Sequence, residues 1–242
     1  MRNYWDALKF FPKINGKWDF IMGRRYNARN EWGTFRCVDR FSIANLFPGW
    51  EAGVNSVIMA HKGEGLFVDV GANIGVHSVT AGKLGMEVIA LEPALASFQC
   101  LKTNLTTNRI KGSALRMAAW SSSGWMTLHL SHKSSMFNSL YDTDVDGTKL
   151  TEGYHVKTVR LDELLYDQGR IPRLIKLDAE KAEEEVIKGL TLTLGKRSTT
   201  LVFEAIALGD LRDCTALLNT LGYEVKQVKN AVNLYLATPS TP

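Results

Sequence analysis

The stretch that decides the fold is FVDVGANIG, which spans residues 67–75. An apolar run that closes on an acid and a glycine is typical of a buried parallel strand leading into a tight turn. Glycines suit such a turn because the backbone must bend sharply and let a ligand lie where a side chain would otherwise be. A helix is predicted directly afterwards, from about Val76 to Leu84. This order of strand, glycine turn and helix predicts a nucleotide or nucleoside site.

The spacing inside this stretch distinguishes two kinds of binding loop. A dinucleotide site has the pattern G-x-G-x-x-G, so that a helix N-terminus can approach a pyrophosphate. Here Asp69, Gly71, Asn73 and Gly75 alternate with other residues, which fails that pattern at the middle glycine and at the final spacing. The arrangement fits the D-x-G-x-G-x-G loop of S-adenosylmethionine-dependent methyltransferases, with Asn73 in place of one glycine. The alternative is that the glycines only make a turn, which Asp69 caps.

A second acid stands at the end of the next predicted strand. Glu92 follows the apolar run at 87–91, and Pro93 suits the first turn of a helix. At the carboxyl edge of an open α/β sheet, such an acid can accept hydrogen bonds from two ribose hydroxyls. The simpler interpretation is a solvated strand-end acid. Together with Asp69 in the same strand–turn–helix context, Glu92 predicts a nucleoside site.

Strands alternate with helical stretches over the rest of the body, which predicts an α/β domain with helices on both faces of a mostly parallel sheet. An acidic helix is expected to follow Asp178 and run to Leu190, with Ala182, Val186 and Leu190 facing inward. The last two strands are joined by only a few residues and should form an antiparallel hairpin. The predicted strands are 65–70, 87–91, 114–119, 125–130, 156–161, 174–178, 200–204, 224–228 and 232–237.

Five motifs follow one another along the chain: DVGANIG at 69–75, Glu92-Pro93, VRLDEL at 159–164, KLDAEKAE at 176–183 and VFE at 202–204. With these motifs in this order, the chain resembles the FkbM family of methyltransferases over about Leu66 to Ala205. Two positions depart from the family pattern: Lys181 stands where the family has glycine, and Arg160 stands where threonine is usual.

The resemblance implies a class I (Rossmann-like) methyltransferase, with a seven-stranded mostly parallel sheet and a C-terminal antiparallel hairpin. It implies S-adenosylmethionine as the cofactor. The methionine part would lie over the glycine loop, the ribose against the acid after the second strand, the adenine after the third strand, and the sulfonium above the end of the fourth. The residues expected to contact the cofactor are Asp69, Gly71, Asn73, Ile74, Gly75, Glu92, Pro93, Met117, Ala118 and Asp178.

A hydroxyl is a poor nucleophile, so its methylation needs a group that takes or orients its proton. We expect Asp178 in this role, with Glu204 and Lys181 in support. The alternative is that Asp178 and Glu180 only cap the following helix, whose first turn favours acids. These acids could also offer oxygen ligands to Mg²⁺, but surface ion pairs explain them as well and we expect no metal. His77 follows the glycine loop and could contact a ligand or pack on the sheet.

The first part of the chain differs from the body in composition. Residues 1–50 hold nine Lys and Arg against four Asp and Glu, and 12 of the 23 aromatic residues. We expect residues 1–64 to form a basic, aromatic, helical extension or substrate lid, and residues 65–242 to form the methyltransferase domain. The same composition would also suit single-stranded RNA, since arginines neutralise phosphates and aromatic rings stack on bases.

These features predict an O-methyltransferase that acts on a hydroxyl of a sugar, glycan or secondary metabolite. One alternative is an RNA ribose 2′-O-methyltransferase, and another is a non-catalytic subunit that binds the cofactor. No apolar run reaches the roughly 18 residues of a membrane helix, and no secretory signal is expected. Three cysteines without a C-x-x-C pair favour a reducing compartment, and hence the cytoplasm. The oligomeric state is left open.

Overall fold

The computed structural model describes residues 26–47, 49–63, 65–131, 138–143 and 149–240. Its centre is a seven-stranded sheet in the order β11-β12-β10-β9-β3-β4-β5. The strands from β10 to β5 are parallel, while β12 runs antiparallel to both β10 and β11. The predicted class I sheet and its C-terminal hairpin are therefore confirmed. The strands are β3 Leu66–Val70, β4 Glu87–Leu91, β5 Gly112–Leu115, β9 Leu174–Leu177, β10 Thr200–Glu204, β11 Tyr223–Gln227 and β12 Leu234–Pro239.

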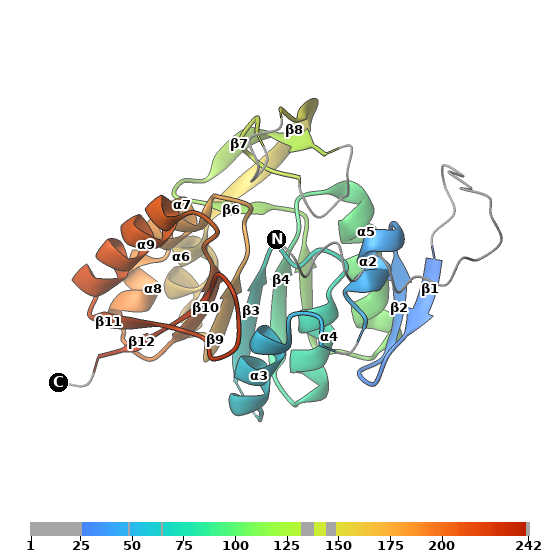
Figure 1. Ribbon diagram of the computed structural model, residues 1–242, viewed down its shortest axis with the longest axis horizontal. Coiled ribbons are helices and arrows are strands. Elements are labelled where there is room, and N and C mark those ends of the chain that lie inside the picture. The colour runs from blue at the N-terminus through green and yellow to red at the C-terminus, as the bar shows by residue number, and fades with distance from the viewer. Residues whose placement is uncertain (1–25, 48, 64, 132–137, 144–148, 241–242) are drawn as a thin grey trace.

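Helices cover both faces of this sheet, as Figure 1 shows. One face carries α3 Ala52–Ala60, α4 Val76–Lys83 and α5 Leu95–Thr107, and the other carries α6 Leu161–Leu164, α7 Glu183–Lys188, α8 Thr191–Gly195 and α9 Leu208–Thr220. A short 3-10 helix, η2, spans Tyr166–Gln168. Side chains alternate between the two cores because successive residues of a strand face opposite ways. Val68 packs with Val186 and Leu218, whereas its neighbour Phe67 packs with Val57 and Val79.

A second sheet, of three strands, lies above the carboxyl ends of the central strands (Figure 1). It consists of β6 Ala118–Trp120, β7 Gly124–Leu130 and β8 Thr151–Arg160. The single strand predicted at 114–119 is therefore wrong: the chain leaves the central sheet after Leu115, and β6 pairs with β8 instead. Ala118 is buried there against Leu128 and Val156, so a separate small core holds β6 away from β5.

The described part of the N-terminal segment is only partly helical. Strands β1 Tyr26–Arg29 and β2 Thr34–Cys37 form an antiparallel ribbon, and α2 Arg40–Ala44 and α3 follow it. The prediction of a helical extension is thus corrected for these two strands. Phe35 and Cys37 are buried in the same core as Phe67 and Val88, so the ribbon packs on the α5 side of the body. Residues 1–25, with Arg24 and Arg25, lie outside the described residues.

Asn104 of α5 and Asn108, which caps the C-terminus of α5, take the place of a strand beside β2. Asn104 accepts from the Arg36 N–H (2.6 Å) and donates to its carbonyl (3.0 Å). Asn108 does the same with Thr34 at 3.0 and 2.8 Å. The match in spacing explains this: four helical residues rise about 6 Å, and two strand residues about 6.6–6.8 Å. The edge of β2 is therefore paired by side chains.

Within the described ranges, none of the helices is long and apolar enough to cross a membrane.

Candidate active site

The glycine loop joins β3 to α4 through three residues in the left-handed region. Gly71 has φ +70°, Asn73 φ +50° and Gly75 φ +87°. A Cβ at Gly71 would lie 1.8 Å from the carbonyl oxygen of Asp178, so only glycine lets the loop pass the end of β9. Asparagine tolerates the left-handed region better than most residues do, which explains how Asn73 can replace a glycine.

Glu92 fastens this loop to the end of β4. Its Oε2 accepts a hydrogen bond from the Asn73 N–H and its Oε1 accepts one from the Ala94 N–H, both at 2.8 Å. Burial raises the pKa of Glu92 to about 7, although both hydrogen bonds favour the charged form. Each carboxylate oxygen has a second lone pair. Glu92 can therefore hold the loop and still accept hydrogen bonds from a ligand at the sheet edge.

Ile74 is fully buried in the core that contains Phe67 and Val79, and its carbonyl accepts a 2.8 Å hydrogen bond from Asn104. Its side chain therefore belongs to the core and is not exposed at the sheet edge. Asp69 is also fully buried, and the Ser78 hydroxyl donates to its Oδ2 at 2.5 Å. Asp69 therefore ties β3 to the first turn of α4 beneath the loop. Their roles as cofactor contacts remain predictions.

Lys176 lies at the centre of the site, although its position in the sequence predicted no role for it. The parallel register sets it directly beside Asp69 on the same face of the sheet. Its Nζ donates to Asp178 Oδ2 at 3.0 Å and to the Gly71 carbonyl at 3.2 Å, and lies 3.8 Å from Asp69 Oδ1. Burial lowers the pKa of Lys176, but nearby carboxylates more than compensate and raise it above its usual value. Its signal in the sequence is a lone lysine in an apolar strand.

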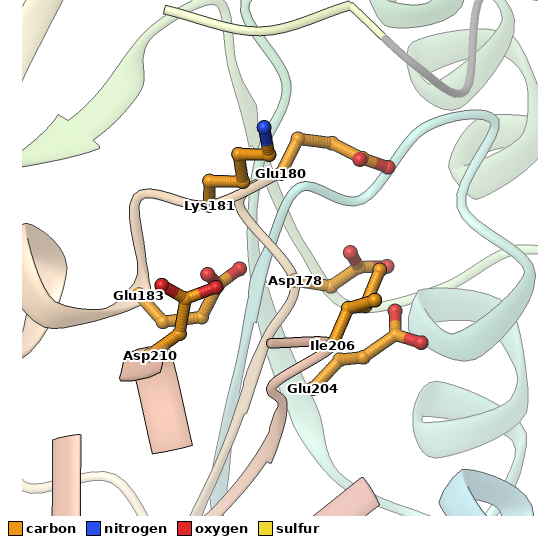
Figure 2. A pocket seen from close by; sticks show the side chains of 7 residues that line it. All are labelled: Asp178, Glu180, Lys181, Glu183, Glu204, Ile206 and Asp210. Carbon is orange, nitrogen blue, oxygen red and sulfur yellow. The ribbon is translucent and has the colours of Figure 1, made fainter. Parts of the chain in front are cut away.

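A pocket opens beyond the ends of β9 and β10, and Figure 2 shows its side chains. The three predicted catalytic residues, Asp178, Lys181 and Glu204, all line it. The carboxylates of Asp178 and Glu204 lie on the same side of the pocket, whereas the Lys181 ammonium points away from both (Figure 2). Burial raises the pKa of Glu204 to about 8, and the charges of Asp178 and Glu51 add to the effect. The full lining is Asp178, Glu180, Lys181, Glu183, Glu204, Ile206 and Asp210.

Comparison with known proteins identifies the family to which this chain belongs. Residues 69–225 match the methyltransferase FkbM domain. The chain belongs to the FkbM methyltransferase family. It is also 33% identical over 156 residues to the hexuronic acid methyltransferase AglP of Haloferax volcanii, a match that covers 62% of this chain and 60% of that protein. The chain thus spans less than two thirds of that relative's length.

Two solved structures share the fold of this FkbM-family chain. The FkbM methyltransferase of Methylobacillus flagellatus superimposes with a TM-score of 0.50 at 17% identity, covering 72% of this chain and 43% of the other. The 16S rRNA N2 G1207 methyltransferase of T. thermophilus, solved with AdoMet and guanosine, gives 0.51 at 14% identity, covering 90% and 50%. These likenesses confirm the class I fold.

Family membership confirms the prediction of S-adenosylmethionine as the cofactor. The residues at the carboxyl edge fit it. The loop of Gly71, Asn73 and Gly75 presents backbone at a helix N-terminus, and Glu92 stands at the neighbouring strand end. An excess of carboxylates around Lys176 suits a ligand that carries positive charge. Pro93 follows Glu92, and Met117 and Ala118 lie just beyond β5. Contact of these three residues with the cofactor remains a prediction.

The helix predicted to follow Asp178 begins only at Glu183, which corrects its start. Glu180 and Lys181 are both left-handed, at φ +50° and +78°, and such residues cannot continue a right-handed helix. Asp178 therefore lies outside the first turn, against the alternative that it caps the helix. Lys181 occupies a backbone position that suits glycine, the residue typical of the family. The predicted inward residues Ala182, Val186 and Leu190 are confirmed as buried.

Glu51 lies outside every sequence motif, so no role was predicted for it. It precedes α3 with φ +45°. Its Oε2 is hydrogen-bonded to His77 Nε2, in the first turn of α4. Burial raises the pKa of Glu51, but this bond and the His77 charge lower it to about 2. Among the described residues, no group of three or more His, Cys, Asp or Glu is arranged to hold a metal ion.

Proposed function

We propose that this chain transfers the methyl group of S-adenosylmethionine to a hydroxyl of a sugar or glycan. The observation that carries the proposal is the meeting of two carboxylates, Asp178 and Glu204, in one pocket beside the glycine loop. The relative that is 33% identical is a hexuronic acid methyltransferase, which supports a sugar acceptor. The cofactor supplies a methyl carbon that its sulfonium makes electrophilic. Gly71, Asn73, Gly75 and Glu92 would hold it.

The chain's own task is to orient the acceptor hydroxyl and take its proton. Alignment of the two reactants supplies much of the rate enhancement in such a displacement. One oxygen of Asp178 is engaged by Lys176, so this carboxylate is fixed and suited to orienting the hydroxyl. Burial raises the pKa of Glu204 to about 8, so its carboxylate form is a stronger base than an ordinary glutamate and suits removal of the hydroxyl proton. Lys181 would contact the outer part of the acceptor.

The test is transfer of a labelled methyl group to three acceptor fractions: hexuronic acids and neutral sugars, RNA, and small metabolites. We expect label in the sugar fraction. Glu204→Gln should lower turnover about 100-fold, the usual contribution of a general base, while binding of S-adenosylhomocysteine changes less than about two-fold. The control is Glu87→Gln, because Glu87 is half-exposed at the start of β4, the end of that strand opposite to Glu92 and the glycine loop. Unchanged turnover in Glu204→Gln, or no label in sugars, would refute the proposal.

Nothing in the described residues favours the two alternatives over this function. The RNA alternative was based on the basic and aromatic composition of residues 1–50, of which residues 1–25 and 48 lie outside the described residues. The RNA fraction of the same assay tests it directly. A cofactor-binding subunit would label no fraction. A cytoplasmic site of action remains a proposal, supported by three cysteines that are all buried and form no disulfide with one another.

A further inference from the structure

Lys176 joins the two halves of the active site. Its Nζ donates one hydrogen bond to the Gly71 carbonyl, in the glycine loop, and another to Asp178 Oδ2, in the pocket. The residue itself lies in β9 and is only 5% exposed. One buried ammonium group therefore reaches both the loop that would hold the cofactor and a carboxylate that lines the pocket.

The side chain of Asp178 depends on this lysine more than its backbone does. The Asp178 N–H donates to the Val70 carbonyl at 3.2 Å, which fixes the backbone beside the glycine loop. The side chain extends past the end of β9 and is 25% exposed. Among the residues that the structure describes, Lys176 is the one group that hydrogen-bonds this carboxylate. Without it, the carboxylate could rotate away from the loop.

A lysine is costly at this position, which indicates that its charge has a use. The other residues of β9, Leu174, Ile175 and Leu177, are apolar and buried. An ammonium buried among such residues is unfavourable unless carboxylates offset it, and Asp69 Oδ1 lies 3.8 Å from its Nζ. An apolar side chain would suit the strand itself, but it could not hold a carboxylate in the pocket.

We propose that Lys176 is a positioning residue for methyl transfer. By bonding the loop and the carboxylate at once, its ammonium holds Asp178 at a fixed place relative to the cofactor site and thereby keeps the acceptor hydroxyl aligned. A misplacement of about 1 Å can slow such a reaction about 100-fold. Lys176 acts through Asp178 and needs no contact with either reactant. This inference rests on the proposed function, because it requires Asp178 to orient the acceptor.

A double-mutant cycle tests this role. The variants are Lys176→Met, Asp178→Asn and the two combined, assayed by transfer of a labelled methyl group to the sugar fraction. Lys176→Met should lower kcat about 100-fold, because alignment is lost. The KM for S-adenosylmethionine should change less than about three-fold, since Glu92 still holds the loop. Asp178→Asn should lower kcat by a similar factor. The combined variant should fall within about three-fold of Asp178→Asn alone, as expected for residues that act as a unit.

Two further variants separate positioning from support of the fold. Leu218→Ala leaves a cavity in the core beneath α9 and weakens the fold. It should nevertheless keep kcat within about two-fold of wild type at a temperature where circular dichroism shows a folded chain. Lys176→Arg keeps a cation beside Asp69 and replaces Lys176→Met in the cycle if that variant does not fold. Its planar guanidinium donates from other positions, so kcat should fall about ten-fold, with S-adenosylhomocysteine affinity within about three-fold of wild type.

The proposal is overturned if the losses multiply to about 10,000-fold in the combined variant, because Lys176 would then act independently of Asp178. Unchanged kcat in Lys176→Met overturns it as well, and so does a loss that falls on KM alone. A wild-type chain that binds S-adenosylhomocysteine but labels no sugar refutes the proposed function before any variant is made, and the inference falls with it.

Discussion

Two buried polar clusters in this protein are built on opposite plans. The amide cluster consists of Asn104, Asn108 and the β2 backbone that they bond, and it is neutral, with each amide bonded in both directions. The charge cluster consists of Lys176 with Asp69, Asp178, Glu204 and Glu51, and it sets one cation against four carboxyl groups, of which Glu204 has a pKa raised to about 8.

The hydrogen bonding of the two clusters differs in the same way. Asn104 also donates to the Ile74 carbonyl, so its amide reaches a third backbone group. In the charge cluster, by contrast, Asp69 Oδ1 has no hydrogen bond from any residue that the structure describes, and the same holds for the adjoining His77 Nδ1. A cluster whose groups satisfy one another needs nothing further and stabilises the fold. A cluster with surplus charge and unbonded atoms needs a ligand to complete it. Substitutions can test this distinction from both sides.

The largest effect is expected at the cation of the charge cluster. Lys176→Met should lower the free energy of unfolding by about 3–5 kcal/mol, because buried Asp69 and neighbouring Asp178 would lose their shared positive partner. Urea unfolding followed by circular dichroism measures it. A loss below about 1 kcal/mol would mean that these carboxylates are neutral in the folded chain, and the account of a charged cluster would be wrong.

A smaller loss is expected in the amide cluster. Asn104→Ala should lower the free energy of unfolding by about 2–3 kcal/mol, since it removes the partners of Arg36 and Ile74 backbone groups. Asn219→Ala, at an exposed position on α9, is the matched control and should cost less than about 0.5 kcal/mol. S-adenosylhomocysteine affinity should stay within about three-fold of wild type. A large loss of affinity would show that the amide cluster belongs to the site after all.

The smallest effect concerns the pH dependence of stability, and it comes from Glu183, which lines the pocket. Burial raises the pKa of Glu183 to about 7 in the folded chain, above its ordinary value of 4.5. The folded state therefore binds this proton more tightly, and stability falls as pH rises from about 4.5 to about 7. Glu183→Gln removes that dependence and can keep the hydrogen bond from the Ala179 N–H.

We therefore expect Glu183→Gln to be more stable than wild type by about 1–2 kcal/mol at pH 8 and equal to it near pH 4.5. Thermal unfolding at several pH values measures the difference. Parallel pH profiles for the two proteins would contradict the assigned cause.

The central sheet was predictable because a parallel strand buried on both faces is a short apolar run. Strands β3, β4 and β10 follow such runs closely. The break between β5 and β6 was missed since neither Arg116 nor Met117 is a turn-forming residue. The β1–β2 ribbon gave no local signal, because the asparagines that pair β2 lie about seventy positions further along the chain.

The site was predictable where its residues follow one another at fixed spacing. The loop from Asp69 to Gly75 and the acid Glu92 are of this kind, and their arrangement at one sheet edge agrees with the prediction. Lys176 was visible in a quoted motif, but only its register beside Asp69 shows that it is central. Glu51 could not be found from spacing, because folding alone brings it to His77.

The central claim is that the charge cluster and glycine loop form a site for a cationic adenosyl cofactor. Calorimetric titration of the wild-type chain with S-adenosylmethionine, and separately with NADH, tests it most directly. We predict saturable binding of one S-adenosylmethionine per chain and no binding of NADH. Absence of S-adenosylmethionine binding, or tighter binding of the dinucleotide, would contradict the account.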